Sequence, residues 1–215
     1  KFKKKIIFFN NFLYFQKKFK SKLDKVILGV PGLVGLKYAF LFTKHSKEIL
    51  VANKESLVCG ALVLLKEAKN NNCKITSIDS EHFSIYQIIK NKNLNNIDSV
   101  FLTASGGPFL NKKVKSYSKA NIKEVTNHPR WNMGSKISVD SATMCNKIFE
   151  LIEAHILFNI PVEKLKIKIH EESLVHSAIV FKDGLVHMVM HDTTMTIPIR
   201  NSIFENKFNK QSLNF

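Results

Sequence analysis

The sequence predicts an α/β fold in which a parallel sheet comes first and an α+β part follows. In the first part, short apolar runs alternate with stretches of helical spacing, which is typical of parallel strands joined by crossover helices. In the second part, a segment with period-two alternation precedes two apolar runs around a tight turn, the pattern of antiparallel strands. The 215 residues suffice for one large domain or two small ones.

Apolar runs and helical stretches predict the elements of the parallel layer. We expect a strand and a glycine-rich turn within 25–36, a helix over 37–44, a strand over 48–52, a helix over 57–69 and a strand over 75–78. Polar clusters at 53–56 and 79–82 directly follow the second and third strands. Ligands of open parallel sheets bind beyond the carboxyl ends of strands, so both clusters are candidates for a site.

The later cluster contains Asp79 and Glu81, two carboxylates separated by one residue. At an extended strand end both would point to the same side, which suits a hard divalent cation held by oxygen ligands. The alternative is that the pair caps the start of a helix, where acidic residues are common. This stretch by itself leaves both interpretations open.

A small, glycine-rich loop at 104–109 follows an expected strand at 99–103. Because glycine has no side chain, the backbone N–H groups of such a loop can approach a phosphate closely. The loop lacks the Gly-Lys-Ser/Thr ending of a Walker loop, and a plain turn is the alternative. A polar segment over 112–127 is expected to include a short surface helix.

The stretch 128–155 combines a polar loop with a helix. Asp140 and Ser141 are good N-cap residues, and the apolar spacing after them predicts a helix that starts near Ser141. Its polar face carries Asn146, Glu150 and Glu153, with Lys147 beside it. Since helix N-termini favour anions, we expect a phosphate cradle with a metal-capable carboxylate one turn further in. The alternative is an amphipathic helix with a solvated polar face.

The last part of the chain turns antiparallel. Residues 164–170 alternate with period two, and the runs 175–181 and 185–190 flank a hairpin signal at 182–184. Four histidines in this part lack a carboxylate or cysteine set around them, so we expect core or surface histidines: His170, His176, His187 and His191.

The charge and the residue composition limit which binding partners we expect. The net charge is +16, yet arginine occurs only at Arg130 and Arg200, whereas nucleic-acid readers rely on bidentate arginine contacts. A nucleic-acid partner is therefore not expected, although anions are attracted generally. The three cysteines, Cys59, Cys73 and Cys145, show no metal-ligand spacing and indicate a reducing compartment.

Residues 1–20 are basic, aromatic and free of acids, and the sequence does not begin with methionine. A membrane-surface helix, part of a targeting segment and an internal piece of a longer chain remain open, and the missing initiator favours the last. No apolar run approaches the length needed to span a bilayer, so no membrane partner is expected.

Several motifs together resemble the 1-deoxy-D-xylulose 5-phosphate reductoisomerase family. In chain order they are LVANKESLVCG, SIDSEH, LTASGGPF, HPRWNMGSKISVDSATMCNK and IHEESLVHSAIVFKDG, within residues 26–198. The resemblance implies NADPH-dependent isomerisation and reduction of 1-deoxy-D-xylulose 5-phosphate to 2-C-methyl-D-erythritol 4-phosphate, in non-mevalonate isoprenoid biosynthesis. It implies Mn²⁺ or Mg²⁺ as the metal and a sugar phosphate as the substrate.

The same resemblance assigns roles to individual residues. The implied metal carboxylates are Asp79, Glu81 and Glu150, and the implied catalytic residues are Glu81, Glu150 and Lys54. The implied phosphate contacts are Ser105, Ser141, Asn146 and Lys147, and the other substrate contacts are Lys54, Ser80, Glu81, His128 and Glu150. Asn53, Glu55 and Gly134 match positions that touch NADPH, and Trp131 and Met133 match a mobile flap over the substrate.

The sequence departs from the family at both ends, because the N-terminal G-x-G-x-x-G fingerprint and the C-terminal helical domain have no counterpart. We therefore expect a fragment: the end of a Rossmann-like nucleotide-binding domain at 1–78 and an α+β catalytic domain for metal and substrate at 79–215. The isolated chain is expected to be inactive, with an exposed sheet edge and apolar face near 26–30 and 48–52. At full length the family implies a homodimer.

Two alternatives to an enzyme are a degenerate or truncated chain that binds sugar phosphate without turnover and, more distantly, a basic nucleic-acid binder. Composition and pathway together suggest a plastid or apicoplast location, with the bacterial cytoplasm as the alternative.

Overall fold

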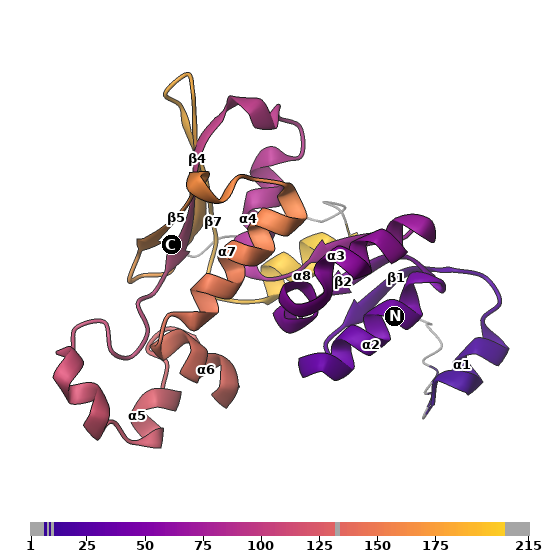
Figure 1. Cartoon of the computed structure of the whole chain (residues 1–215), viewed down its shortest axis with the longest axis horizontal. Coiled ribbons are helices and arrows are strands. Elements are labelled where there is room, and N and C mark those ends of the chain that lie inside the picture. Colours follow the sequence, from indigo (N-terminus) through magenta and orange to yellow (C-terminus); the bar gives the residue numbers. More distant parts are fainter. Residues whose placement is uncertain (1–6, 8, 10, 132–133, 205–215) are drawn as a thin grey trace, which may run out of the picture.

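The structure, a computed structural model, describes residues 7, 9, 11–131 and 134–204. Two sheets lie apart from each other, with helices on and between them (Figure 1). The helices are α1 (Phe12–Lys18), α2 (Gly32–Thr43), α3 (Lys54–Asn70), α4 (Ser80–Ile89), α5 (Ile122–Thr126), α6 (Ser135–Ala142), α7 (Cys145–Phe158) and α8 (Thr196–Phe204), with 3-10 turns η1 (Leu94–Asn96), η2 (Val114–Lys119) and η3 (Val162–Lys164). The strands are β1 (Leu23–Leu28), β2 (Ser46–Val51), β3 (Lys74–Ser77), β4 (Ile97–Ala104), β5 (Leu165–Ile169), β6 (Val175–Phe181) and β7 (Val186–Met190).

The first sheet is parallel, in the order β1-β2-β3, which confirms the predicted layer. The expected exposure is wrong for residues 48–51, because β2 is the central strand and both of its faces are packed, whereas Ala52, just after the strand, is exposed. Ile49 and Leu50, which point to opposite faces, are both fully buried. β1 is the outer strand, and its Ile27 is 53% exposed.

A glycine turn and an asparagine cap fix the start of α3. The Asn53 Oδ1 atom accepts a hydrogen bond from the Ser56 backbone N at 3.0 Å, and Asn53 Nδ2 donates to the backbone oxygens of Val30 at 2.5 Å and Gly32 at 2.8 Å. A Cβ atom at Gly35 would lie 2.2 Å from the Val30 oxygen, so only glycine permits this approach. The first turn of α3 is thereby tied to the carboxyl end of β1.

The second sheet has the order β5-β4-β6-β7. The hairpin β6–β7 is antiparallel, as the turn signal predicts, and β6 also runs antiparallel to β4. β5, in contrast, is parallel to β4, so the expected antiparallel layer is corrected to a mixed one. The chain between these two parallel strands includes α7, which allows β5 to return alongside β4 in the same direction. The core beneath this sheet includes Ile85 of α4 and Ala154 of α7.

The helix that carries the polar cluster begins later than predicted. Asp140 and Ser141 lie in the last turn of α6 and do not cap a helix start, and α7 begins at Cys145. Between them Met144 has φ 62° and ψ 3°, a left-handed conformation that interrupts the helical path. The apolar spacing continues across this break, so the sequence pattern alone does not reveal it.

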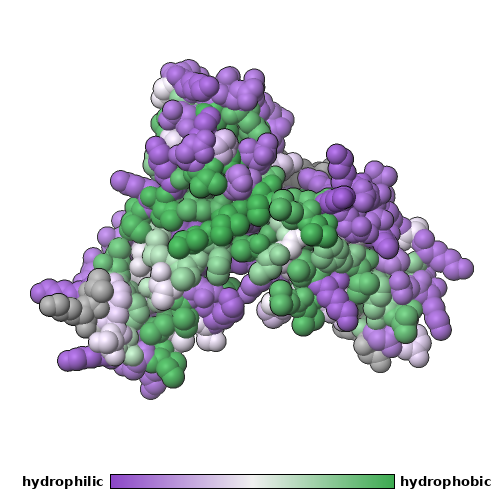
Figure 2. Space-filling model, viewed as in Figure 1, coloured by the Kyte–Doolittle hydropathy of each residue, from purple (hydrophilic) through white to green (hydrophobic). Residues whose placement is uncertain are grey.

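Hydrophobic surface gathers over the middle of the molecule, where α3 and α7 lie, between more hydrophilic ends (Figure 2). These two helices pack against each other. Their exposed apolar side chains include Leu62 and Val63 of α3 and Ile148 and Ile152 of α7. An exposed apolar face therefore exists, but the helices carry much of it and β2 does not.

The N-terminal segment packs on the first half of the chain through aromatic rings. The rings of Phe12 and Phe15 in α1 lie 5.2 and 5.4 Å from the ring of Phe42. Within the described ranges, no helix is long and apolar enough to cross a membrane. Met133 of the expected flap, residues 1–6, 8 and 10 of the basic segment, and the tail from 205 onward lie outside the described residues.

Candidate metal and phosphate site

A cavity of about 370 Å³ lies among α3, α4, α6, α7 and the loop that follows β4. All the residues expected to bind metal or substrate line it: Lys54, Asp79, Ser80, Glu81, Ser105, His128, Ser141, Asn146, Lys147 and Glu150. They come from separate motifs that the fold brings to one place.

Three carboxylates converge in this cavity. Asp79, Glu81 and Glu150 each place an oxygen within 4.8 Å of the others. The expected extended strand end is wrong, because β3 stops at Ser77 and Asp79 caps α4 by accepting from the His82 backbone N at 2.7 Å. Glu81 then follows in the first helical turn. Capping and carboxylate convergence, which the sequence presented as alternatives, therefore occur together.

Lys54 and Asn146 hold one edge of the Glu150 carboxylate. The Lys54 Nζ atom lies 2.7 Å from Asn146 Oδ1 and 2.9 Å from Glu150 Oε1, and Asn146 Nδ2 donates to the same Glu150 oxygen at 2.5 Å. Burial would lower the pKa of Lys54, but attraction to Glu150 and Asp79 outweighs it and raises that pKa. Lys54 is thus held as a buried ammonium.

Lys147 occupies the space between two of the carboxylates. Its Nζ atom lies 2.7 Å from Glu81 Oε1 and 2.5 Å from Glu150 Oε2. Burial would raise the pKa of Glu81, but the charge of Lys147 lowers it below its ordinary value. Lys147 and Glu150 are only 5% and 2% exposed, so the solvated polar face is wrong for this side of α7. The helix buries paired charges against the cavity.

Deeper in the protein, His82 lies between Asp79 and Glu153. Its Nδ1 atom is 2.6 Å from Asp79 Oδ2 and 3.8 Å from Glu153 Oε1. Burial would lower the pKa of His82, but the carboxylates raise it to about 10. Burial raises the pKa of Glu153 to about 7. Burial would also raise the pKa of Asp79, but attraction to His82 is stronger and lowers the pKa of Asp79 below its ordinary value. The sequence placed Glu153 on the polar face of a helix but did not single out His82.

The Ser105 hydroxyl lines the cavity, and its oxygen accepts hydrogen bonds from two neighbouring groups. The backbone N of Gly107 donates to Ser105 Oγ at 3.2 Å, and His128 Nε2 lies 2.9 Å from the same oxygen. His128 Nδ1 accepts from the backbone N atoms of Arg130 and Trp131, so a neutral ring carries its proton on Nε2. Burial lowers the pKa of His128, which favours that neutral form. With two hydrogen bonds accepted, the Ser105 O–H is left to donate to an anion.

The glycine loop after β4 packs on the end of α6. Gly106 and Gly107 have φ values of 86° and 67°, and a Cβ at Gly107 would lie 2.8 Å from the Ser141 backbone oxygen. This close approach requires glycine and places Ser105 and Ser141 on the same cavity. The glycines of the expected phosphate loop therefore bring the segment that carries Ser105 against the segment that carries Ser141.

The residues expected to touch NADPH lie beside the cavity and are not among its lining residues. Glu55 Oε1 is 3.1 Å from Lys136 Nζ, and the same ammonium is 2.7 Å from Asp140 Oδ2, which links the starts of α3 and α6. Gly134 precedes α6, with open space where a Cβ would stand. Both N–H groups of Asn53 are used within the protein, and the cofactor roles of these residues stay predictions.

Sequence reasoning missed several lining residues: Ser173, His176, Met195 and Ile199. His176 is a buried histidine as expected, but it also faces the cavity and stacks on His191 with ring centroids 3.7 Å apart. Burial lowers the pKa of His176 to about 4, so the ring is neutral. The half-buried Trp131 lies over it at 6.0 Å. Only the packing of the sheet against α4 reveals this wall, since no local spacing signals it.

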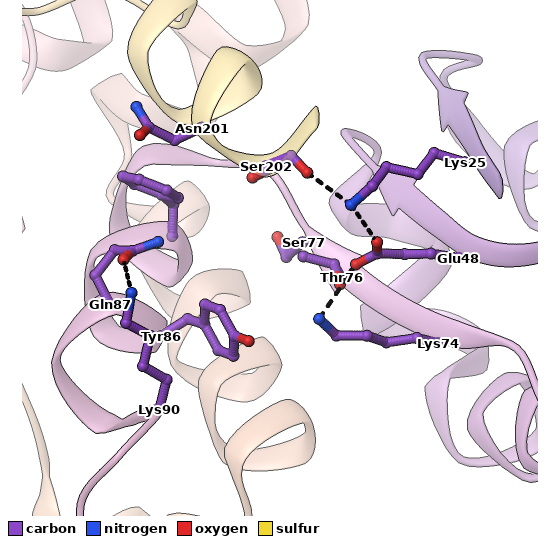
Figure 3. A pocket seen from close by; sticks show the side chains of 11 residues that line it. Lys25, Glu48, Lys74, Thr76, Ser77, Tyr86, Gln87, Lys90, Asn201 and Ser202 are labelled. Atoms are coloured by element: carbon purple, nitrogen blue, oxygen red, sulfur yellow. Dashed lines mark hydrogen bonds and ion pairs between the residues drawn. The ribbon is translucent and has the colours of Figure 1, made fainter. Parts of the chain in front are cut away.

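A second cavity, of about 250 Å³, lies between the first sheet, α4 and α8 (Figure 3). Its central carboxylate, Glu48, is 2.6 Å from Lys25 Nζ and 3.2 Å from Lys74 Nζ, and these three residues pair across neighbouring strands. Among the described residues that line it, none belongs to the expected site. The cross-strand ion pairs explain how this sheet tolerates a buried glutamate.

Two family models match this chain. The one described as 1-deoxy-D-xylulose 5-phosphate reductoisomerase matches residues 14–61, and the one described as the C-terminal domain of that enzyme matches residues 75–158. A protein of that name from Pelagibacter ubique is 43% identical over 204 residues, which cover 94% of this chain and 53% of the relative. One from Thermotoga maritima is 43% identical over 183 residues, covering 85% and 48%.

Solved structures agree with these relatives. A crystal structure of the reductoisomerase in complex with NADPH, fosmidomycin and magnesium superposes with a TM-score of 0.83 at 37% identity, covering 91% of this chain and 50% of that one. The enzyme from Zymomonas mobilis in complex with NADPH gives 0.79 at 32% identity, covering 89% and 49%. The chain thus spans about half the length of the relatives it matches.

Proposed function

Because this chain belongs to the 1-deoxy-D-xylulose 5-phosphate reductoisomerase family, we propose that it carries the metal and substrate site of such an enzyme. The proposed reaction is the isomerisation of 1-deoxy-D-xylulose 5-phosphate and its reduction by NADPH to 2-C-methyl-D-erythritol 4-phosphate. One observation carries the proposal: every side chain expected to bind metal or substrate lines the same cavity.

The carboxylate cluster fits a divalent cation. Asp79, Glu81 and Glu150 offer converging oxygens, the donor type that Mg²⁺ and Mn²⁺ take in proteins. Carboxylate oxygens have further lone pairs beyond those used by the lysines. A solved relative contains magnesium, which supports the assignment. When bound, the cation supplies Lewis-acid polarisation of the substrate carbonyl and its neighbouring hydroxyl.

Metal binding and phosphate binding are coupled in this proposal through Lys147. Without a cation, its ammonium neutralises Glu81 and Glu150. When these carboxylates hold a divalent cation, the ammonium becomes available to a phosphate on the cavity side. The Ser105 hydroxyl, whose oxygen already accepts two hydrogen bonds, and the hydroxyl of Ser141 complete the phosphate contacts.

Phosphate binding at one part of the cavity orients the rest of the substrate toward the carboxylates. Lys54 lies beside Glu150 and is assigned the stabilisation of negative charge on substrate oxygens as the carbon skeleton rearranges. Trp131, whose ring lies edge-to-face with His176, is assigned the exclusion of water above the substrate. When bound, NADPH would supply the hydride that reduces the aldehyde formed by this rearrangement.

The NADPH side of the site is assigned to the starts of α3 and α6, where Glu55 and Gly134 lie. A structure of the Zymomonas mobilis relative in complex with NADPH supports this cofactor. We further propose a homodimer for the complete protein and a plastid or apicoplast location, with the bacterial cytoplasm as the alternative.

The test has a binding arm and a turnover arm. In the binding arm, 1-deoxy-D-xylulose 5-phosphate is titrated calorimetrically into the 215-residue chain with and without Mn²⁺. We expect binding that requires the metal and that is lost in Glu150→Gln. Glu163→Gln, an exposed glutamate beyond α7, is the matched control and should bind as the unaltered chain does. Binding that ignores both Mn²⁺ and Glu150 would refute the site.

The turnover arm uses the complete gene product, NADPH, Mn²⁺ and 1-deoxy-D-xylulose 5-phosphate. We expect loss of NADPH absorbance and a new phosphorus resonance from methylerythritol phosphate. Substrate binding without either change would favour the alternative, a sugar-phosphate-binding chain without turnover. The complete set of metal and phosphate residues argues against that alternative.

A further inference from the structure

His82 contacts two of the three metal carboxylate residues at once. Both oxygens of Asp79 accept from it, Oδ1 from the His82 backbone N at 2.7 Å and Oδ2 from Nδ1 at 2.6 Å. On the other side of the ring, Nε2 lies 2.9 Å from the backbone oxygen of Glu150. Each ring nitrogen of His82 therefore lies at hydrogen-bond distance from an oxygen acceptor, one on Asp79 and one on the backbone of Glu150. One buried ring thus ties the cap of α4 to the middle of α7.

Glu153 packs beside the same ring. It lies on α7, one turn beyond Glu150, is 1% exposed, and places Oε1 3.8 Å from His82 Nδ1. Its Oε2 atom has no hydrogen-bond partner among the residues that the structure describes. The ring of Phe158 lies on the His82 ring at an interplanar angle of 30°, with centroids 6.1 Å apart. Burying a carboxylate costs free energy unless a neighbouring group compensates it, and His82 lies where it can do so.

We propose that Glu153 is a positioning residue for the metal site, which acts through His82 to fix the Asp79 carboxylate and the Glu150 backbone relative to each other. This inference rests on the metal ligands of the proposed function and adds a residue that does not touch the metal or the substrate. If the Glu153 carboxylate is removed, the His82 ring loses its contact on that side and can shift together with the Asp79 carboxylate that it holds. Outer partners of metal ligands typically change metal affinity by about 10- to 100-fold when they are removed.

The test uses the folded fraction of the full 215-residue chain. Mn²⁺ binding is measured from the electron paramagnetic resonance signal of the Mn²⁺ that stays free. Glu153→Gln and His82→Gln should each raise the dissociation constant about 10- to 100-fold. Because both residues act on the same ligands, the double variant should bind no more than about twofold more weakly than the weaker single variant. Glu153→Asp keeps the charge and should recover part of the affinity.

Glu48→Gln is the matched control, since Glu48 is also a buried glutamate with cationic partners but lies in the second cavity. It should lose stability in urea without a change in the Mn²⁺ dissociation constant, which separates positioning from general destabilisation. Should Glu153→Gln not fold, Glu153→Asp must still bind Mn²⁺ more weakly than the unaltered chain.

The outcomes separate this inference from the proposed function. Loss of Mn²⁺ binding in Glu150→Gln together with unaltered binding in Glu153→Gln would overturn the role of Glu153 and leave the metal site intact. Absence of Mn²⁺ binding in the unaltered chain would overturn both. Strict additivity of His82→Gln and Glu153→Gln would also overturn the inference, because it would mean that the two residues act independently.

Discussion

Lys54 of α3 and Glu150 of α7 are 96 residues apart in sequence, yet Lys54 Nζ lies 2.9 Å from Glu150 Oε1. Their side chains are only 14% and 3% exposed, so removal of either partner leaves a buried charge without compensation. This pair joins the end of the first sheet to the helix that carries the candidate metal ligand. Changes at the site are therefore expected to affect both folding and ligand binding.

Glu150→Gln keeps the size of the side chain but removes a negative metal ligand. We expect the metal affinity of the complete gene product to fall, and its turnover with it, because one of three converging carboxylates becomes neutral. The measurement is the rate as a function of Mn²⁺ concentration. Retention of the unaltered rate at limiting Mn²⁺ would show that Glu150 is not a ligand.

Lys147→Ala should weaken the binding of a phosphonate analogue, while Mn²⁺ itself binds no more weakly, because the ammonium that pairs with Glu81 and Glu150 is removed. The lost charge-assisted contact is worth about 1.5–3 kcal/mol, which corresponds to roughly ten- to a hundredfold in affinity. Calorimetry at saturating Mn²⁺ measures this loss, with Lys112→Ala as the control because Lys112 contacts Glu124 and the Phe109 ring and does not line the cavity. An unchanged affinity would place the phosphate elsewhere.

The pH dependence of stability should include a term from His176. Its folded pKa of about 4 lies below the ordinary value of 6.5, because burial disfavours the charged ring. Between these two values the unfolded chain binds more protons, so the His176 contribution to the free energy of unfolding rises with pH by on the order of 3 kcal/mol at most. Glu153, whose pKa is raised from 4.5 to about 7, contributes a fall over the same range, whereas the raised pKa of His82, about 10, places its loss of stability between pH 6.5 and 10.

Urea titrations from pH 4 to 7 measure the His176 term. His176→Asn should make the slope of stability against pH less positive than in the unaltered chain, whereas His187→Asn, on the neighbouring strand, is the control for loss of a histidine from the same sheet. An unchanged slope in His176→Asn would assign the slope to other groups.

Asn159 ends α7 in a left-handed conformation, with φ 51° and ψ 38°. Asparagine and glycine tolerate this region, whereas alanine is disfavoured there by about 1 kcal/mol or more. Asn159→Ala should therefore lower the free energy of unfolding by about that amount, and Asn159→Gly should leave it unchanged or raise it slightly. Equal stability of the two variants in urea would contradict the left-handed cap.

The parallel layer could be predicted from the sequence because its signals are local. Short apolar runs predicted β2 and β3, and the asparagine before α3 and the turn 182–184 behave as their residue types suggest. The residues expected to bind metal and substrate lie in short sequence motifs, so the sequence alone was enough to name them.

Tertiary structure decided what these residues contact. The break at Met144 depends on a left-handed backbone that packing imposes, so the apolar spacing that predicted one helix from Ser141 could not reveal it. The parallel pairing of β5 with β4 and the inclusion of His176 in the cavity wall arise from pairing between distant segments. The burial of Lys147 and Glu150 has the same origin, because charged side chains leave water only where a folded partner, here Glu81 and Lys54, compensates the cost.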